Sequence, residues 1–356
     1  MKKLIYSLIV LFLIFGCKKE GCIDPTAINY NQHAEKDDGS CRYDSIENAL
    51  PPIIDSDLTL TNDKIWYLVS RTSITNGATL TIEPGTIIKG EAGTGPNATA
   101  LIVARGSKID AQGTENQPII FTSEADNIQI GQRVGSSLNN TINGLWGGLV
   151  ILGNAPISAA NVSMQIEGIP ASDPSGLYGG ALPSDNSGVL KYISIRHGGA
   201  NIGEGNELNG LTLGGVGSST IIENIEVVAN QDDGVECFGG NVNIENVLIW
   251  GVGDDCLDVD QGYSGTINNS LIIPLPFTDH VLEIDGGEGI WNADFSITNC
   301  ESISELSQAH FRAEASGYVS LLGNFNIETD PGTNVQIDSL STGADYSKFN
   351  WTYYFN

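Results

Sequence analysis

The chain has 356 residues, with 43 glycines and 13 prolines, and its 43 acidic against 16 basic side chains give a formal net charge of -27. A nucleic-acid backbone is bound by a surface of lysine and arginine, so this charge argues against a nucleic-acid partner; cations, basic proteins and neutral glycans stay compatible with it. The glycine and proline content favours many short strands joined by tight turns, and a repeat architecture of this length can form one unit.

The first residues predict an export signal. Lys2 and Lys3 precede an apolar run over residues 4–15, and Gly16-Cys17 follows directly. The run is shorter than the roughly 20 residues that cross a bilayer. Its end resembles the bacterial lipoprotein signal, which implies removal of residues 1–16, a lipid on Cys17, and anchoring at the outer membrane or cell surface. A plain secretory signal is the alternative, because Phe15 is bulkier than the residue usual there.

Residues 17–43 are predicted to form a lipidated start and a short module. Residues 21–43 carry the pattern G-C-x-D-P-x-A-x-N-Y and then D-D-G-S-C. They resemble a disulfide-closed module of surface proteins from Bacteroidetes-type bacteria, which implies a bond between Cys22 and Cys41. Two interpretations of its polar residues stay open, a metal-free loop of Asx turns or a Ca²⁺ site. The oxygen ligands in the second case are Asp24, Asn29, Asp37 and Asp38. Residues 44–57, with Pro51-Pro52, are predicted to be a linker.

Short strand patterns fill the rest of the chain. Residues 79–89, 101–114 and 118–123 are successive apolar strands with Gly and Pro corners. They predict an all-β fold over residues 58–356, a single-stranded right-handed parallel β-helix with about three strands per coil and about a dozen coils. Residues 123–143 and 164–187 interrupt the pattern and are predicted to be long loops, which form groove walls in many proteins or are disordered inserts.

Three segments repeat one pattern, starting at Asp233, Asp255 and His280, with spacings of 22 and then 25 residues. Apolar and acidic residues alternate in each segment, so the apolar ones are expected inside the solenoid and the acidic ones outside. The expected inward residues are Val235, Cys237, Leu257, Val259, Leu282 and Ile284. The expected outward residues are Glu236, Asp258 and Glu283.

The outward residues form a predicted column of carboxylates about 5 Å apart. Like charges that close raise each other's pKa unless a cation or solvent compensates them, so Ca²⁺ at Glu236, Asp258 and Glu283 is one interpretation and a solvated ladder the other. The alignment extends the column backwards to Thr212 and forwards to Arg312. It also places Cys237 inward and Cys256 outward, so no disulfide is expected between them.

The strand patterns, together with residues 146–157, 206–217 and 232–240, resemble a family of right-handed β-helix surface proteins from the same bacteria, of the pectin-lyase-like type. That resemblance covers nearly the whole chain after residue 57. It implies an architecture and an exported surface protein, without an assigned activity.

A second resemblance is to polygalacturonase-type glycoside hydrolases, which use N-T-D-G, D-D-C, G-H-G and R-I-K on consecutive coils. It implies catalytic roles for Asp233, Asp254, Asp255 and His280, with Arg312 binding a substrate carboxylate, in an inverting mechanism. The sequence departs from the family pattern, since the asparagine is displaced to Asn230 and the lysine is replaced by Glu314. The competing interpretation is that these Asp residues cap turns at strand ends.

The sequence therefore predicts a lipid-anchored, monomeric envelope protein whose β-helix binds a polysaccharide, with hydrolysis of one as the alternative. Trp250, Tyr263 and Tyr178 are candidate aromatics for stacking on sugars, and core positions are the other possibility. His197 is expected to be a turn residue. No cofactor other than Ca²⁺ is indicated, because the four histidines show no zinc-ligand spacing.

Overall fold

The computed structural model describes residues 19, 21, 23, 33–37, 47–202, 208–289 and 291–356. The chain divides into two compact units, Met1–Glu47 and Asn48–Asn356. In the first unit the Glu35 N–H donates to Lys19 O at 2.7 Å and the Gly21 N–H donates to Lys36 O at 3.1 Å. The expected lipid, disulfide and most expected Ca²⁺ positions lie outside the described residues, namely Cys17, Cys22, Cys41, Asp24, Asn29 and Asp38. Nowhere in the described ranges is there a helix long and apolar enough to span a bilayer.

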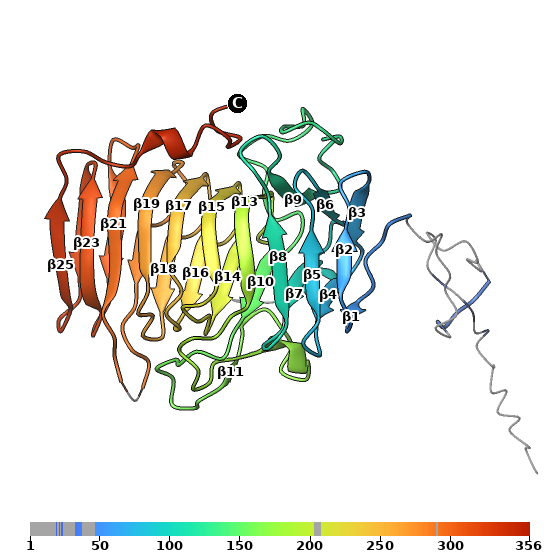
Figure 1. Ribbon diagram of the computed structural model, residues 1–356, viewed down its shortest axis with the longest axis horizontal. Coiled ribbons are helices and arrows are strands. Elements are labelled where there is room, and N and C mark those ends of the chain that lie inside the picture. The colour runs from blue at the N-terminus through green and yellow to red at the C-terminus, as the bar shows by residue number, and fades with distance from the viewer. Residues whose placement is uncertain are drawn as a thin grey trace, which may run out of the picture. The chain divides into compact units, whose positions relative to one another are not determined.

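The second unit is built on a parallel sheet of ten strands, one per coil (Figure 1). Every neighbouring pair along it is parallel. Its order is β1 (Ile53–Ile54), β4 (Arg71–Ile74), β7 (Ala100–Val103), β10 (Leu149–Leu152), β14 (Leu211–Gly214), β16 (Val235–Phe238), β18 (Leu257–Asp260), β20 (Leu282–Ile284), β22 (Ser307–Phe311) and β24 (Phe325–Thr329). The all-β parallel solenoid predicted from the sequence is confirmed, with ten levels in this sheet rather than a dozen.

A second parallel sheet, of thirteen strands, faces the first across the core. Its main path runs through β2 (Leu58–Leu60), β5 (Thr79–Ile82), β8 (Lys108–Gln112), β13 (Gly188–Arg196), β15 (Ile221–Val228), β17 (Ile244–Trp250), β19 (Thr266–Ile273), β21 (Phe295–Ser302), β23 (Ser316–Leu322) and β25 (Asn334–Ser339). Three further strands, β3 (Ile65–Leu68), β6 (Ile87–Gly90) and β9 (Ile119–Ser123), pair beside it. The two halves of β13 pair with β8 and β9, so two strands of a coil continue as one longer strand from β13 onward.

Five of these longer strands, β13, β15, β17, β19 and β21, contain a residue in the left-handed region. The backbone φ is 53° at Tyr192, 59° at Asn224, 62° at Asn246 and 61° at Asn269. Asparagine tolerates this conformation better than most side chains. The stacked amides also bond along the axis, since Asn246 Nδ2 donates to Asn224 Oδ1 at 3.2 Å and Asn269 Nδ2 donates to Asn246 Oδ1 at 2.6 Å. Because of the bend at this residue, one long strand covers two faces of its coil, and the strand of the ten-stranded sheet covers the third.

The core between the sheets holds the predicted inward residues. Val235, Leu257 and Leu282 are buried there, and so are Cys237, Val259 and Ile284, two residues further along each strand. The prediction for Cys256 was wrong: this side chain is fully buried in the same core. Cys256 lies in the turn before β18, where side chains do not alternate strictly between inside and outside as they do along a strand. Cys237, Cys256 and Cys300 are all free and buried.

The predicted linker ends earlier than residue 57. Leu50 and Ile54 are buried in the core, and Ile54 pairs with Ile74 of β4. The PP sequence at residues 51–52 therefore belongs to the first coil. The two apolar side chains give residues 48–57 a place in the folded unit, and the β-helix unit begins at Asn48.

Two segments cover the outer faces of the solenoid. The insert between β10 and β13 contains β11 (Met164–Gln165), η2 (Pro174–Gly176) and the antiparallel β12 (Leu177–Tyr178). It packs on outward residues of the ten-stranded sheet, where Ile157 and Ile169 meet Ile102 and Val150. The C-terminal segment after β25, with η3 (Tyr346–Lys348), packs on the thirteen-stranded sheet through Phe349. A short η1 (Gly95–Asn97) precedes β7.

Candidate functional site

The turns before three consecutive strands of the ten-stranded sheet are linked by carboxyl groups. Asp233 Oδ1 accepts the backbone N–H of Asp255 at 2.9 Å. In the next coil Asp255 Oδ1 accepts the backbone N–H of His280 at 2.9 Å and lies 2.9 Å from His280 Nδ1. Both Asp residues therefore cap turns, as the non-catalytic interpretation expected. The same hydrogen bonds align Asp233, Asp255 and His280 along the axis of the solenoid.

A second line runs along the outward positions of the strands themselves. The register pairs Thr212 with Glu236, Glu236 with Asp258, and Asp258 with Glu283, as predicted. The next residue in line is His310, so the forward extension to Arg312 was wrong. Ala309 and Phe311 point inward from β22, which turns His310 outward level with Glu283.

Arg312 is the next outward-facing residue after His310, because Phe311 between them points inward. Its Nε donates to Glu283 Oε1 at 3.1 Å, its Nη2 contacts the same oxygen, and its Nε lies 3.3 Å from Asp285 Oδ1. It thus offsets part of the charge of Glu283.

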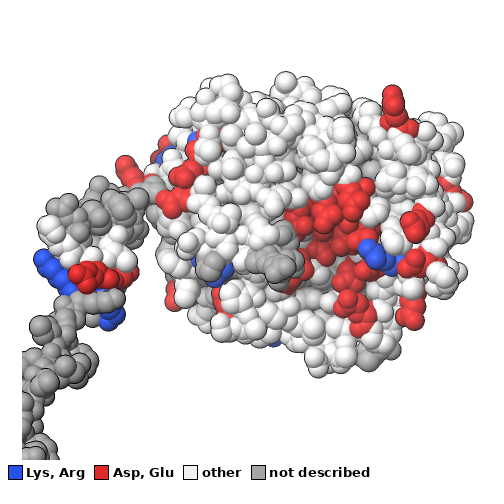
Figure 2. Space-filling view, turned by 180° about the vertical axis from the view of Figure 1, so that it is seen from behind, with Lys and Arg blue, Asp and Glu red and all other residues white. Residues whose placement is uncertain are grey.

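We call the outer side of β16, β18 and β20, with the turns that precede them, the acidic face. Its carboxyl groups are Asp233, Glu236, Asp254, Asp255, Asp258, Asp260 and Glu283. Figure 2 shows acidic side chains gathered on this side of the molecule, with few basic ones among them. Glu236 is only 5% exposed, so the predicted solvated ladder is wrong for this member; Asp255, in the turn beside it, is only 4% exposed.

Burial and mutual repulsion raise the pKa of several of these carboxyl groups. Burial, and then the Asp258 charge, raise the pKa of Asp233 and of Glu236 well above normal. Burial and then Glu283 raise the pKa of Asp255 to about 8. Asp254 is exposed, but a partial loss of solvation and then the Asp279 charge raise its pKa as well. Perturbed carboxyl groups that converge on one face make that face a candidate functional site.

Sequence reasoning missed a parallel row of acids at the ends of the same strands. Asp260, paired with Phe238, is buried, and its pKa is raised to about 7 by burial and then by Glu288. Asp285 follows Ile284 in the next coil, and its pKa is raised by burial. The signal was present, since the repeats read Leu-Asp-Val-Asp and Leu-Glu-Ile-Asp, with an acid at both outward positions.

The insert between β10 and β13 borders the acidic face where β16 and β18 end. Ser158 Oγ accepts the N–H of Glu288 at 2.9 Å, and the Ser158 N–H donates to Gln261 O at 2.9 Å. Tyr178 Oη donates to Gln261 Oε1 at 2.9 Å. The predicted loop over residues 164–187 belongs to this insert. These bonds hold the insert against the sheet, where it forms one wall of the site.

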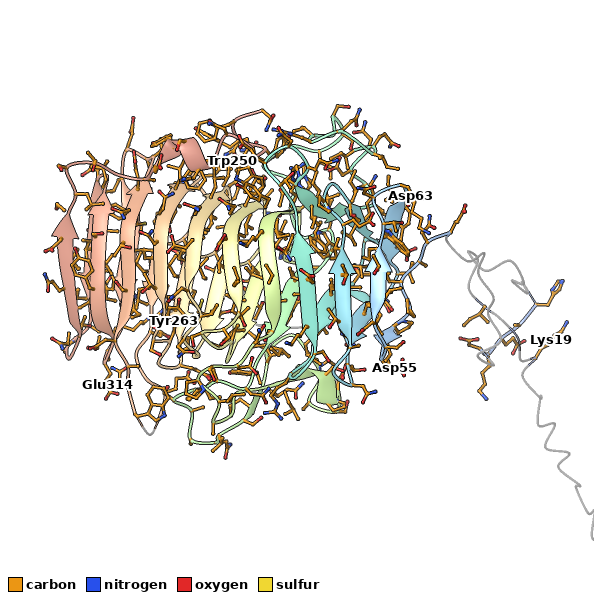
Figure 3. All side chains as sticks on the ribbon, viewed as in Figure 1. Lys19, Asp55, Asp63, Trp250, Tyr263 and Glu314 are labelled. Carbon is orange, nitrogen blue, oxygen red and sulfur yellow. The ribbon has the colours of Figure 1, made fainter. Side chains whose placement is uncertain are left out.

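The three aromatic residues suggested for sugar stacking do not form a platform. Tyr178 and Tyr263 are buried, 2% and 1% exposed. Trp250 packs edge-on against Tyr353 and Tyr354 of the C-terminal segment, with ring centroids 5.6 and 5.1 Å away. Figure 3 shows Trp250 beside that segment and Tyr263 within a coil. The core interpretation is confirmed for Tyr178 and Tyr263, whereas Trp250 is half-buried under the C-terminal segment.

Several groups of oxygen and nitrogen atoms on the acidic face are close enough to share an ion. Asp233, Glu236 and Asp258 offer ligand atoms within 4.8 Å of one another, as do Asp232, Asp233 and Asp254. Asp258 Oδ1 is buried and has no hydrogen-bond partner. A cation held at about 2.4 Å from each oxygen, the distance typical of Ca²⁺, fits atoms spaced this way. Asp37, the described member of the N-terminal Ca²⁺ set, is exposed.

The residues carried over from the hydrolase resemblance also gather here. Asp233, Asp255 and His280 stack through the bonds described above, and Asp254 lies beside Asp233. His197, by contrast, lies apart in a turn: it is buried, its Nδ1 is 2.6 Å from Ile142 O, and its φ is 61°. The sequence expected it to be a turn residue.

The fold and the site define a parallel β-helix protein with an acidic site on the outer face of one sheet. A family model described as a pectate-lyase-like β-helix domain matches residues 52–313, most of the chain, and the chain belongs to that family. No curated protein and no solved structure matches the chain. Membership fits a role in surface binding or in the handling of polysaccharides.

Proposed function

We propose that this protein is a lipid-anchored component of the bacterial cell envelope that binds polysaccharide on its acidic face, with Ca²⁺ between the carboxyl groups. The observation that carries the proposal is the convergence of Asp233, Glu236 and Asp258 within 4.8 Å, with Asp258 Oδ1 buried and unpaired. Ionising a buried carboxyl group without a counter-charge is costly, so a cation at this point stabilises the ionised groups in place of protons. Ca²⁺ also accepts ligands from sugar hydroxyl and carboxylate oxygens, which makes it a bridge to a glycan.

The shape of the fold supports an extended ligand. A solenoid repeats its outward residues at every level, so the acidic face presents similar groups along the axis rather than at one point. The insert wall at Ser158 and Gln261 borders that line on one side. The export pattern over residues 1–16 and Cys17 supports the location at the envelope. A Cys17→Ser variant is expected to leave the membrane fraction of the producing cell.

Isothermal titration and a polysaccharide pull-down test the binding proposal. The purified protein is expected to bind Ca²⁺ and, in its presence, an acidic polysaccharide such as polygalacturonate, with loss of both after chelation. Asp258→Asn is expected to lower Ca²⁺ affinity at least about tenfold, because it removes a charged ligand. Asp338→Asn, on exposed β25, is the matched control and keeps both activities. Polysaccharide retained equally by the chelated protein and by Asp258→Asn would remove the cation from the proposal.

A specific observation also favours polysaccharide hydrolysis as the second candidate function. A general acid needs a carboxyl group that stays protonated at neutral pH, and Asp255, with its pKa raised to about 8, meets that requirement. Its neighbour Asp254 is exposed and can meet a substrate or an attacking water. New reducing ends, lost in Asp254→Asn and Asp255→Asn but not in Asp338→Asn, would establish the enzyme. Binding without any new reducing ends would exclude it.

A further inference from the structure

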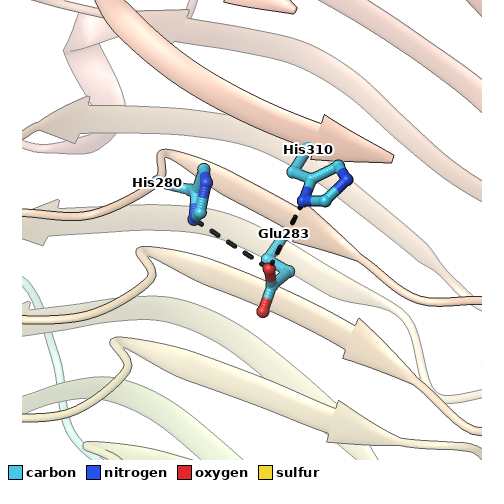
Figure 4. A group of neighbouring side chains, drawn as sticks. All are labelled: His280, Glu283 and His310. Carbon is cyan, nitrogen blue, oxygen red and sulfur yellow. Dashed lines mark ion pairs between the residues drawn. The ribbon is translucent and has the colours of Figure 1, made fainter. Parts of the chain in front are cut away.

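Two histidines from neighbouring coils face one carboxylate at the edge of the acidic face. His280 lies in the turn before β20, Glu283 is in the middle of β20, and His310 is its register partner in β22. His280 Nδ1 is 4.0 Å and His310 Nδ1 is 3.9 Å from Glu283 Oε1, and Figure 4 shows both rings turned toward it. One ligand atom from each of the three residues lies within 4.8 Å of the others.

These separations are too long for hydrogen bonds and suit ligands of one ion. A donor and an acceptor that bond directly lie about 3 Å apart. Bonds of about 2.0–2.2 Å from nitrogen and oxygen to a tetrahedral ion place the ligand atoms roughly 3.3 Å from one another. The three side chains reach that spacing by moving inward by a fraction of an ångström each.

The surroundings fix the ring of His310 in the way known metal sites do. His310 Nε2 lies 3.3 Å from Asp330 Oδ1, so Asp330 can hold that nitrogen as the N–H and leave the lone pair on Nδ1, toward Glu283. A ligand histidine whose other nitrogen bonds a carboxylate is the usual outer-sphere arrangement. His280 Nδ1 lies 2.9 Å from Asp255 Oδ1, and an ion bound at this nitrogen takes the place of that hydrogen bond.

Exposure and charge allow an ion to enter and stay. The side chains of His280, Glu283 and His310 are 22%, 17% and 14% exposed, which leaves a path to solvent. Arg312 shares Glu283 Oε1, and Asp285 Oδ1, 3.3 Å from its Nε, gives the guanidinium a second partner when an ion takes the oxygen. Two imidazoles with one carboxylate suit Zn²⁺ and its first-row neighbours, whereas Ca²⁺ takes oxygen ligands.

We infer that His280, Glu283 and His310 form a binding site for a divalent transition metal of the Zn²⁺ class, with Asp330 orienting His310. The site is separate from the proposed Ca²⁺ position at Asp233, Glu236 and Asp258. An ion here ties the turn before β20 to β22 in the next coil. It also adds positive charge next to the acidic face.

Zn²⁺ titration of the purified full chain tests the site. We expect one tightly bound ion, and an affinity lowered at least about 100-fold in His280→Gln and in His310→Gln. Asp330→Asn, which touches no ion, is expected to weaken binding about tenfold or more through the ring of His310. His33→Gln, in the other unit, is the matched control and leaves the affinity unchanged. Melting temperatures in chelator show whether each variant is folded.

Co²⁺ substitution supplies a second readout, because the visible absorption of the bound ion reports its ligands. The spectrum is expected to change in both histidine variants and to persist in Asp258→Asn, which separates this site from the proposed Ca²⁺ position. A parent chain that binds no Zn²⁺, or histidine variants that bind it as the parent does, would overturn the inference. Loss of Ca²⁺ and polysaccharide binding with intact Zn²⁺ binding would instead count against the proposed function alone.

Discussion

The two outer faces of this solenoid bury charged groups in opposite ways. On the thirteen-stranded sheet Arg196 and Glu226 are 2% and 0% exposed, and their nearest charged atoms are 3.6 Å apart. Ser194 Oγ bonds both side chains, and Tyr353 of the C-terminal segment donates its N–H to Glu226 at 2.6 Å. On the acidic face the buried carboxyl groups have mainly other carboxyl groups as charged neighbours.

This comparison distinguishes a buried ion pair that stabilises the fold from a cluster of carboxyl groups that indicates a binding site. The Arg196–Glu226 pair is neutral as a unit, is hydrogen-bonded to Ser194 Oγ, Arg133 O and the Tyr353 N–H, and lies beneath a covering segment. The acidic face leaves Asp258 Oδ1 unpaired and stays open to solvent at Asp254. Stability alone gives no reason to retain such a cluster, because neutral or apolar residues would pack there at lower cost. The cluster therefore points to a ligand.

Breaking the buried pair is expected to have the largest effect. Arg196→Met leaves the Glu226 carboxyl buried without its cation, and loss of one partner of a buried pair costs about 3–5 kcal/mol. Burial already raises the pKa of Glu226 and lowers that of Arg196, against the effect of their pairing. Urea denaturation measures the change in the free energy of unfolding. A loss below about 1 kcal/mol would show that the C-terminal segment, not the pair, carries the stability of this face.

The acidic face is expected to make the protein less stable as pH rises. The pKa of Asp255 is about 8 in the folded state against 3.8 normally, so between about pH 4 and pH 8 the folded protein holds a proton that the unfolded chain releases. The free energy of unfolding falls across that interval, by about 1.4 kcal/mol for each unit of pKa shift at most. Melting temperatures in chelator should therefore be lower at pH 8 than at pH 5. Added Ca²⁺ should reduce the difference, since the cation replaces the protons; a melting temperature that rises with pH in chelator would contradict the assignment.

The smallest expected effect on stability comes from removing an acid at the centre of the cluster. Asp258→Asn keeps the shape of the side chain and deletes one member of a repelling set, so in chelator the free energy of unfolding should change by about 1 kcal/mol or less, or increase. The same substitution removes the stabilisation by Ca²⁺. Thermal melts with and without Ca²⁺ measure both. A large loss of stability in chelator would make Asp258 structural, like Glu226.

Most of the acidic column could be predicted from the repeats, while the histidine site could not. The 22- and 25-residue spacings were enough to align Glu236, Asp258 and Glu283, because each coil shifts the pattern by one level. The loop between β20 and β22 is longer, and the alignment there moved to Arg312 instead of His310. The zinc motif search missed His280 and His310 because 30 positions in the sequence separate residues that stacking places side by side.

The sequence by itself determined the parallel solenoid, its inward residues and the acidic residues that face outward. These follow from alternation along each strand and from repetition between coils, which are local properties of the chain. Only the tertiary structure decided that Glu236 and Asp255 are buried, that Cys256 points inward, and that His310 joins Glu283. Burial on the outer faces depends on how the insert and the C-terminal segment fold back over the strands, and no local pattern encodes those contacts.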